Sequence, residues 1–192
     1  SDLILHNSEM EKDQLSRLFA VPKDKMKVVY NGVDGGMVNA DPRLFRLQYG
    51  NEPFILSVGR VEPRKNQLNL ILAAKKIKGH RLILIGSAVS GQEGYYEKCI
   101  KEGKDFTTFI PALQHSDPLF RSAYAACEVC VLPGWFETPG LVALEAALAG
   151  AKVVVTEGGS TREYFEGYAD FLDPSSVENI YQKISLNLIK PK

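Results

Sequence analysis

Residues 129–155, VCVLPGWFETPGLVALEAALAGAKVVV, contain the pattern on which the fold depends. A short apolar run at 129–132 is followed by a helical pattern at 141–149 and a second apolar run at 152–155. Two apolar runs on either side of one helix predict a βαβ unit, whose strands lie parallel in one sheet. The helical pattern contains a single polar side chain, Glu145, so we expect this helix to be buried nearly all round.

Two carboxylates stand at the start of this helix and within it. Burying the Glu145 carboxylate without a partner would cost several kcal/mol of folding free energy. We therefore expect it to contact either a cation elsewhere in the chain or the hydroxyls of a ligand. Glu137 lies just outside the helix. Pro139 suits a first helical turn, and Gly140 lets a ligand approach bare N–H groups there. This arrangement predicts a site for a charged, polyhydroxylated ligand.

The same alternation of apolar and helical patterns extends to both sides. Further strands are predicted at 54–58, 81–85, 107–110 and 168–172. Further helices are predicted at 67–77, 95–102, 118–126, 161–165 and 177–189. Residues 51–192 therefore predict an α/β fold with a doubly wound, mostly parallel sheet. Residues 1–50 do not follow this rhythm, and we interpret them as a lead-in segment with helices at 8–19 and 41–50 and a short strand at 27–30.

The composition excludes several classes of protein. The chain has 192 residues, of which 45% are apolar and 24% charged, and its formal net charge is zero. A neutral chain argues against nucleic acid as the partner, and no apolar run is long enough to span a membrane. Three cysteines do not form a secreted disulfide framework, so we expect a reducing, cytoplasmic setting. Cys127 and Cys130 lie in a predicted strand, where we expect a structural role.

A basic pair follows the predicted strand 54–58. Gly59 and Arg60 end this strand, and Lys65 precedes the next helix. Ligands of open α/β sheets bind at the carboxyl ends of strands. A guanidinium and an ammonium together suit a diphosphate, and the alternative interpretation is a solvated loop. The loop lacks the GxGxxG pattern, which disfavours a nicotinamide cofactor.

Metal and P-loop sites are disfavoured by the sequence. His6, His80 and His115 are scattered and no Asp-x-Asp occurs, so we expect no divalent metal. Residues 86–91 carry the outer glycines of a phosphate-binding loop, but the Lys and Ser/Thr that should follow are missing. The Gly-Gly-Ser at 158–160 either approaches a ligand or forms a tight turn.

In their order and spacing, these segments resemble the C-terminal, donor-nucleotide-binding domain of retaining glycosyltransferases of the GT-B fold, group 1 (family 4). The matching segments are 28–34, 59–66, 124–133, 137–145 and 156–163. The resemblance implies a Rossmann-like domain, the C-terminal half of a GT-B fold, whose ligand is a nucleotide-diphospho-sugar. It also implies that no metal or other cofactor is needed, and that the N-terminal acceptor domain is absent from this chain.

The resemblance assigns roles to individual residues. It implies that Arg60 and Lys65 hold the diphosphate of the nucleotide sugar and that Gly59 belongs to the same nucleotide-sugar site. It implies that Glu145 accepts hydrogen bonds from the ribose hydroxyls. The base is expected near Ile110, although the chain has proline at position 111, where the family commonly has glycine.

The sugar end of the implied site departs from the family pattern. Glu137 is the implied catalytic residue, which orients the transferred sugar, and the N–H groups around Gly140 and Leu141 hold the phosphate and the sugar. The family usually has Gly-Phe where this chain has Thr138 and Pro139. Because proline has no N–H, we expect a sugar pocket that is altered in detail.

The implied activity is metal-independent, configuration-retaining transfer of a hexose from a nucleotide sugar, as in polysaccharide biosynthesis. The acceptor, a glycan, lipid or small molecule, and any peripheral membrane contact would depend on the absent domain. This chain alone is expected to be inactive. One alternative is another GT-B sugar-nucleotide enzyme, such as an epimerase or a phosphorylase. The other is a nucleotide-binding module without activity of its own.

Overall fold

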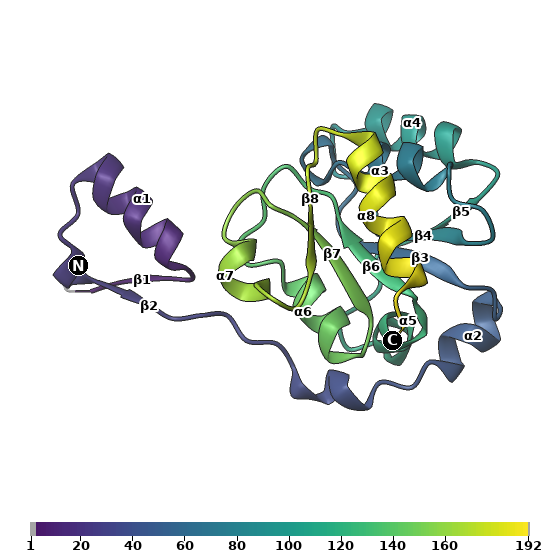
Figure 1. The fold of residues 1–192 in the computed structure, drawn as a ribbon, viewed down its shortest axis with the longest axis horizontal. Helices are drawn as coiled ribbons and strands as arrows, with labels where there is room; N and C mark the ends of the chain where they lie inside the picture. The colour runs from purple at the N-terminus through teal and green to yellow at the C-terminus, as the bar shows by residue number, and fades with distance from the viewer. Residues whose placement is uncertain (1–2, 192) are drawn as a thin grey trace.

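The central element of the protein is a six-stranded sheet, seen in a computed structural model that describes residues 3–191 (Figure 1). Its strands are β3 (Phe54–Val58), β4 (Arg81–Ile85), β5 (Thr107–Ile110), β6 (Val129–Leu132), β7 (Lys152–Thr156) and β8 (Asp170–Leu172). They are all parallel and lie in the order β5-β4-β3-β6-β7-β8. This is the doubly wound order, whose switch point lies between β3 and β6, and the predicted fold class is confirmed.

Helices cover both faces of the sheet (Figure 1). One face carries α3 (Gln67–Ala74), α4 (Glu93–Gly103) and α8 (Val177–Ile189). The other face carries α2 (Arg43–Tyr49), α5 (Pro118–Ala126), α6 (Leu141–Leu148) and α7 (Thr161–Phe165). The predicted helices are all present, with ends displaced by up to three residues.

The apolar core lies in two layers because successive strand residues point to opposite faces. In β3, Phe54 and Leu56 enter the layer under α2, α5 and α6, whereas Ile55 enters the layer under α3 and α8. The same alternation holds for β4, β6 and β7. Both faces are covered, so these strands read as continuous apolar runs in the sequence.

Helix α6 is less buried than its composition predicts. Ala143 and Ala146 are fully buried, but Leu141 and Leu148 are 42% and 40% exposed. The expectation of burial all round is therefore wrong, because this short helix packs closely through its alanines. Gly140, at a φ of +82°, is the N-cap of the helix. Pro139 therefore lies before the helix and not in its first turn, where we expected it.

The N-terminal residues form a separate small unit, set apart from the main sheet (Figure 1). Strands β1 (Ile4–His6) and β2 (Met26–Val28) pair in parallel, and α1 (Glu9–Phe19) connects them. The predicted helix 8–19 is confirmed, and the Ser8 hydroxyl caps it by accepting from the N–H of Glu11. Strand β1 was not predicted. The chain from residue 35 to 49 packs against the main body through the turn at Gly35–Asn39 and α2.

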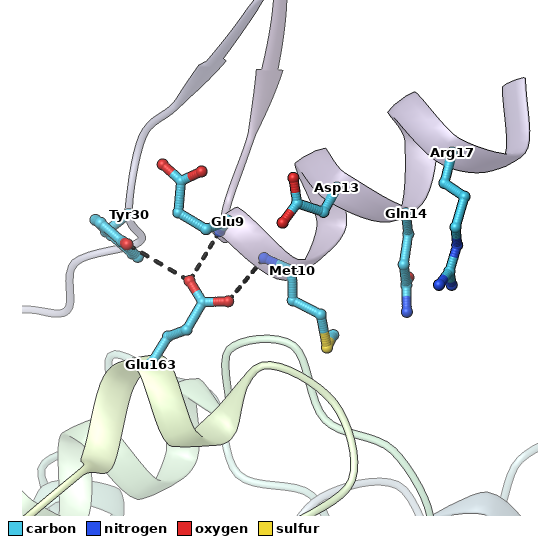
Figure 2. Close-up of a pocket in the computed structure, with 7 residues that line it drawn as sticks. All are labelled: Glu9, Met10, Asp13, Gln14, Arg17, Tyr30 and Glu163. Carbon is cyan, nitrogen blue, oxygen red and sulfur yellow. Dashed lines mark hydrogen bonds between the residues drawn. The ribbon is translucent and has the colours of Figure 1, made fainter. Parts of the chain in front are cut away.

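One carboxylate of the main body holds this unit in place. Glu163 of α7 accepts from the backbone N–H groups of Glu9 and Met10, each at 2.8 Å (Figure 2). Together with the Ser8 cap, these contacts serve the first three N–H donors of α1. The Tyr164 hydroxyl adds a donation to the carbonyl of Asn7. A cavity of about 660 Å³ opens beside this contact, between α1, Tyr30 and Glu163.

Replacing Glu163 by glutamine should loosen the N-terminal unit without unfolding the sheet. The variant loses the negative charge and one of the two acceptor oxygens, a change comparable to loss of a helix cap at about 0.5–2 kcal/mol. We expect hydrogen exchange at the Glu9 and Met10 amides to become about 2- to 30-fold faster. Glu166→Gln, on an exposed carboxylate just beyond the same helix, is the control. Unaltered exchange in Glu163→Gln would contradict a holding role.

Candidate functional site

The loops that follow β3 and β6 meet at the switch point of the sheet. Lys65 lies in the loop after β3 and Glu137 in the loop after β6. The Lys65 ammonium donates to Glu137 Oε1 across 2.5 Å. The Glu137 side chain is 8% exposed and that of Lys65 is 22% exposed. Two residues that the sequence places at separate strand ends therefore form one ion pair in a recess that water reaches only in part.

Two arginines of the loop after β3 share one carboxylate. Arg60 Nη2 lies 3.3 Å from Glu62 Oε1, and Arg64 Nη2 lies 3.2 Å from the same oxygen. Arg64 also donates to the carbonyl of Phe136 at 3.3 Å, which ties the two loops together. The Arg60 side chain is 66% exposed, so its guanidinium can reorient toward a ligand.

A cavity of about 370 Å³ lies at the carboxyl ends of β3, β4 and β5. Gly59 and Gly86 contribute only backbone to its lining. They follow neighbouring strands and approach each other closely. A Cβ on Gly86 would stand 1.9 Å from the carbonyl oxygen of Gly59, so no side chain fits there. Leu113 and Phe120 form apolar walls and Arg60 borders the opening. The cavity thus combines apolar walls with one charged side chain.

Glu145 meets two side chains rather than a lysine or arginine. The Tyr124 hydroxyl donates to its Oε2 at 2.9 Å, and His115 Nε2 lies 2.7 Å from its Oε1. The Glu145 side chain is 8% exposed. Burial raises the pKa of Tyr124, so its hydroxyl remains a hydrogen-bond donor at neutral pH. Each carboxylate oxygen thus has one protein partner and can still accept from a ligand hydroxyl.

The first turn of α6 faces the same edge of the sheet. No side chain caps it, because the N-cap is Gly140. Pro139 is buried and Thr138 is exposed beside Glu137. The loop also pairs with 158–160, since Glu137 N–H donates to the carbonyl of Gly158 at 3.1 Å. The Gly-Gly-Ser segment thus forms a close turn against the Glu137 loop.

Ile110, near which the base is predicted, is the last residue of β5. Its side chain is buried in the core, and its carbonyl accepts from the N–H of Gly86 at 2.8 Å. Ala112 and Leu113, two and three residues further on, line the cavity. His115 and Tyr124 were not predicted as partners of Glu145, although His115 lies on the same sheet edge as the predicted site.

Within residues 3–191 no group of three or more His, Cys, Asp or Glu side chains is placed to hold a metal ion. No helix in this described part of the chain is long and apolar enough to cross a membrane. Within the described residues, Cys99, Cys127 and Cys130 are buried thiols that form no disulfide. Burial raises the pKa of Cys130 well above its usual range, and it raises that of Cys99 to about 11, so neither thiol is a ready nucleophile.

Residues 44–192 match the family model described as glycosyl transferases group 1, and the chain belongs to this family. It is 32% identical over 166 residues to a glycosyltransferase of Methanocaldococcus jannaschii, which covers 81% of this chain and 42% of that protein. It is 27% identical over 168 residues to the D-inositol 3-phosphate glycosyltransferase of Mycobacteroides abscessus, covering 83% and 38%. The chain thus spans less than half the length of these curated relatives.

Solved structures confirm the fold. The chain is similar to Anabaena HepE in complex with UDP and glucose, with a TM-score of 0.88 and 22% identity over 99% of this chain and 54% of that one. It is also similar to sucrose-phosphate synthase from Thermosynechococcus elongatus, with a TM-score of 0.87 and 24% identity over 100% and 50%. The predicted Rossmann-like domain of the GT-B fold is therefore correct.

Proposed function

We propose that this chain is the donor-binding domain of a retaining hexosyltransferase and binds a nucleotide-diphospho-sugar without a metal ion. The observation that carries the proposal is the convergence of basic and acidic groups at one switch point. Arg60 and Lys65 supply positive charge, while Glu137 and Glu145 are buried carboxylates. A sugar nucleotide has the complementary chemistry, because its diphosphate is anionic and both of its sugars carry hydroxyls.

The diphosphate would lie between the two basic side chains and the start of α6. Arg60 offers a planar fork that is free to turn toward solvent, and Lys65 offers a point charge. The N–H groups of the first turn, beside Gly140 and Leu141, favour a phosphate oxygen. Three sources of positive potential replace the cation that many phosphate sites use.

The two ends of the ligand would meet different surfaces. The base fits the cavity of about 370 Å³ between Gly59, Gly86 and Leu113, and the ribose hydroxyls meet Glu145. The transferred sugar lies toward Glu137, whose carboxylate is fixed by Lys65 and can accept from sugar hydroxyls. The complex of Anabaena HepE with UDP and glucose supports a ligand of this class.

The chemical step would be promoted by electrostatic stabilisation of the leaving group. When the bond from the sugar to the diphosphate breaks, negative charge grows on the nucleoside diphosphate, and Arg60, Lys65 and the start of α6 stabilise it. Glu137 orients the sugar and does not attack it. The acceptor, a glycan, lipid or small molecule, would bind to a further domain of the whole protein. We place this activity in the cytoplasm, in polysaccharide biosynthesis.

Glu145→Gln tests the nucleotide assignment. The variant keeps the shape of the side chain and can still accept from Tyr124, so we expect it to fold with a nearly unchanged melting temperature. It loses the charge, and affinity for the tightest of UDP, GDP and ADP should fall about 10-fold or more. Isothermal titration calorimetry measures this, with Glu102→Gln on α4 as the control. A lower melting temperature with unchanged affinity would mean that Glu145 serves the fold alone.

A further inference from the structure

His115 contacts the carboxylate of Glu145 and lies close to the cavity at the carboxyl ends of β3, β4 and β5. It lies in the loop from β5 to α5, two residues beyond Leu113, which lines the cavity. Its ring centre lies 5.6 Å from that of Phe120, which forms another wall of the same cavity. The imidazole therefore lies near the cavity to which the proposed function assigns the base.

The contact between His115 and Glu145 has the geometry of a strong hydrogen bond. Nε2 lies 2.7 Å from Oε1. An ionised carboxylate can only accept, so the imidazole is the donor at Nε2. The His115 side chain is 57% exposed, whereas the Glu145 side chain is 8% exposed. Because more than half of the imidazole is exposed, His115 contributes little to core packing. Its replacement should therefore affect mainly the hydrogen bond to Glu145.

The two protein donors together fix the plane of the carboxylate. Tyr124 holds Oε2 from the buried side at 2.9 Å. With this single contact, the carboxylate could still turn about its terminal bond and displace Oε1. His115 holds this second oxygen, so the plane of the carboxylate is set before any ligand arrives. One acceptor position on each oxygen is left, which matches two vicinal hydroxyls.

We propose that His115 is the positioning residue for Glu145, which sets both carboxylate oxygens to accept from the 2′- and 3′-hydroxyls of a ribose. This rests on the proposed function, because it presumes that a nucleotide binds here. Its contribution is preorganisation: without His115 the carboxylate must be ordered when the ligand binds, and affinity falls accordingly. Asp34 is a charged group near His115, and its carboxylate is paired with Arg121 across 2.5 Å.

The test compares a nucleoside diphosphate with its 2′-deoxy counterpart by calorimetry. UDP, GDP and ADP are titrated first, and the tightest is paired with its deoxy form. The wild-type chain should prefer the ribose form by about 10-fold or more. In His115→Ala this preference should fall to about threefold or less, because the carboxylate is no longer held. His115→Gln, which keeps an N–H donor near the place of Nε2, should restore most of it.

Two results would overturn the proposal, and they are distinguishable from failure of the proposed function. If His115→Ala weakens both forms equally, or neither, the ribose preference does not depend on His115 and the proposal is wrong. If the wild-type chain binds none of the three nucleotides, the proposed function itself falls, and this inference with it. His80→Ala, at the opposite edge of the sheet before β4, is the matched histidine control and should leave the preference unchanged.

Discussion

Replacing Arg60 by alanine should weaken binding of a nucleoside diphosphate by about 10- to 150-fold, the value of one or two charge-assisted contacts. The guanidinium is 66% exposed and its contact with Glu62 spans 3.3 Å, so it contributes little to folding. The melting temperature should therefore hold while affinity falls. Calorimetry with the tightest of UDP, GDP and ADP measures the loss, and EDTA should not alter the wild-type affinity.

Lys65→Ala should reduce affinity by a similar factor and also destabilise the fold. Its ammonium is the 2.5 Å partner of the buried Glu137 carboxylate, which the substitution leaves unpaired. Loss of one partner of a buried pair costs up to about 3–5 kcal/mol, less here because Lys65 is partly exposed. The double variant Lys65→Ala with Glu137→Gln should recover stability without recovering affinity, which separates the two roles of the lysine.

The control for both variants is Arg64→Ala. Arg64 carries the same charge on the same loop, but it does not line the cavity that Arg60 borders, and its guanidinium also donates to the carbonyl of Phe136. We expect its loss to change affinity less than threefold. If Arg60→Ala and Lys65→Ala bind as tightly as wild type, or if EDTA abolishes binding, the metal-free diphosphate site is wrong.

The sheet was predictable from sequence because its strands are covered on both faces. Such strands read as uninterrupted apolar runs, as 129–132 and 152–155 do, and the helices between them have a different period. Strand β1 was missed for a different reason. It has three residues, and the apolar run at 3–5 is too short to distinguish a strand from other structure.

The site was predictable at the level of which residues gather, but not of which residues bond. Lys65 and Glu137 follow parallel strands, whose carboxyl ends share one edge, so their proximity could be inferred. Their direct pairing depends on the paths of two loops. Glu145 was recognisable as buried from its apolar neighbours, whereas Tyr124 and His115 reach it from 21 and 30 residues away. Those contacts depend on how α5 and the loop before it pack on α6, which no local pattern encodes.

The isolated chain should bind a sugar nucleotide and transfer its sugar to no acceptor. Holding both reactants in one geometry supplies about 7–11 kcal/mol of many enzymatic barriers. In the proposed function Arg60, Lys65, Glu137 and Glu145 would all serve the donor. The chain spans 42% of its M. jannaschii relative, and the ends of α1 and α8 carry exposed apolar side chains that a further domain would cover.

A radioactive-sugar assay tests this directly. The purified chain is incubated with the UDP-, GDP- and ADP-glucose forms, with glucose, glycerol and inositol phosphate offered as acceptors, and both transfer and hydrolysis are followed. Binding measured by calorimetry in the same buffer establishes that the site is folded, so absence of product is informative. We expect no product above the protein-free control. Multiple turnovers would mean that these residues already form a complete catalytic site, and that assigning the acceptor to another domain is wrong.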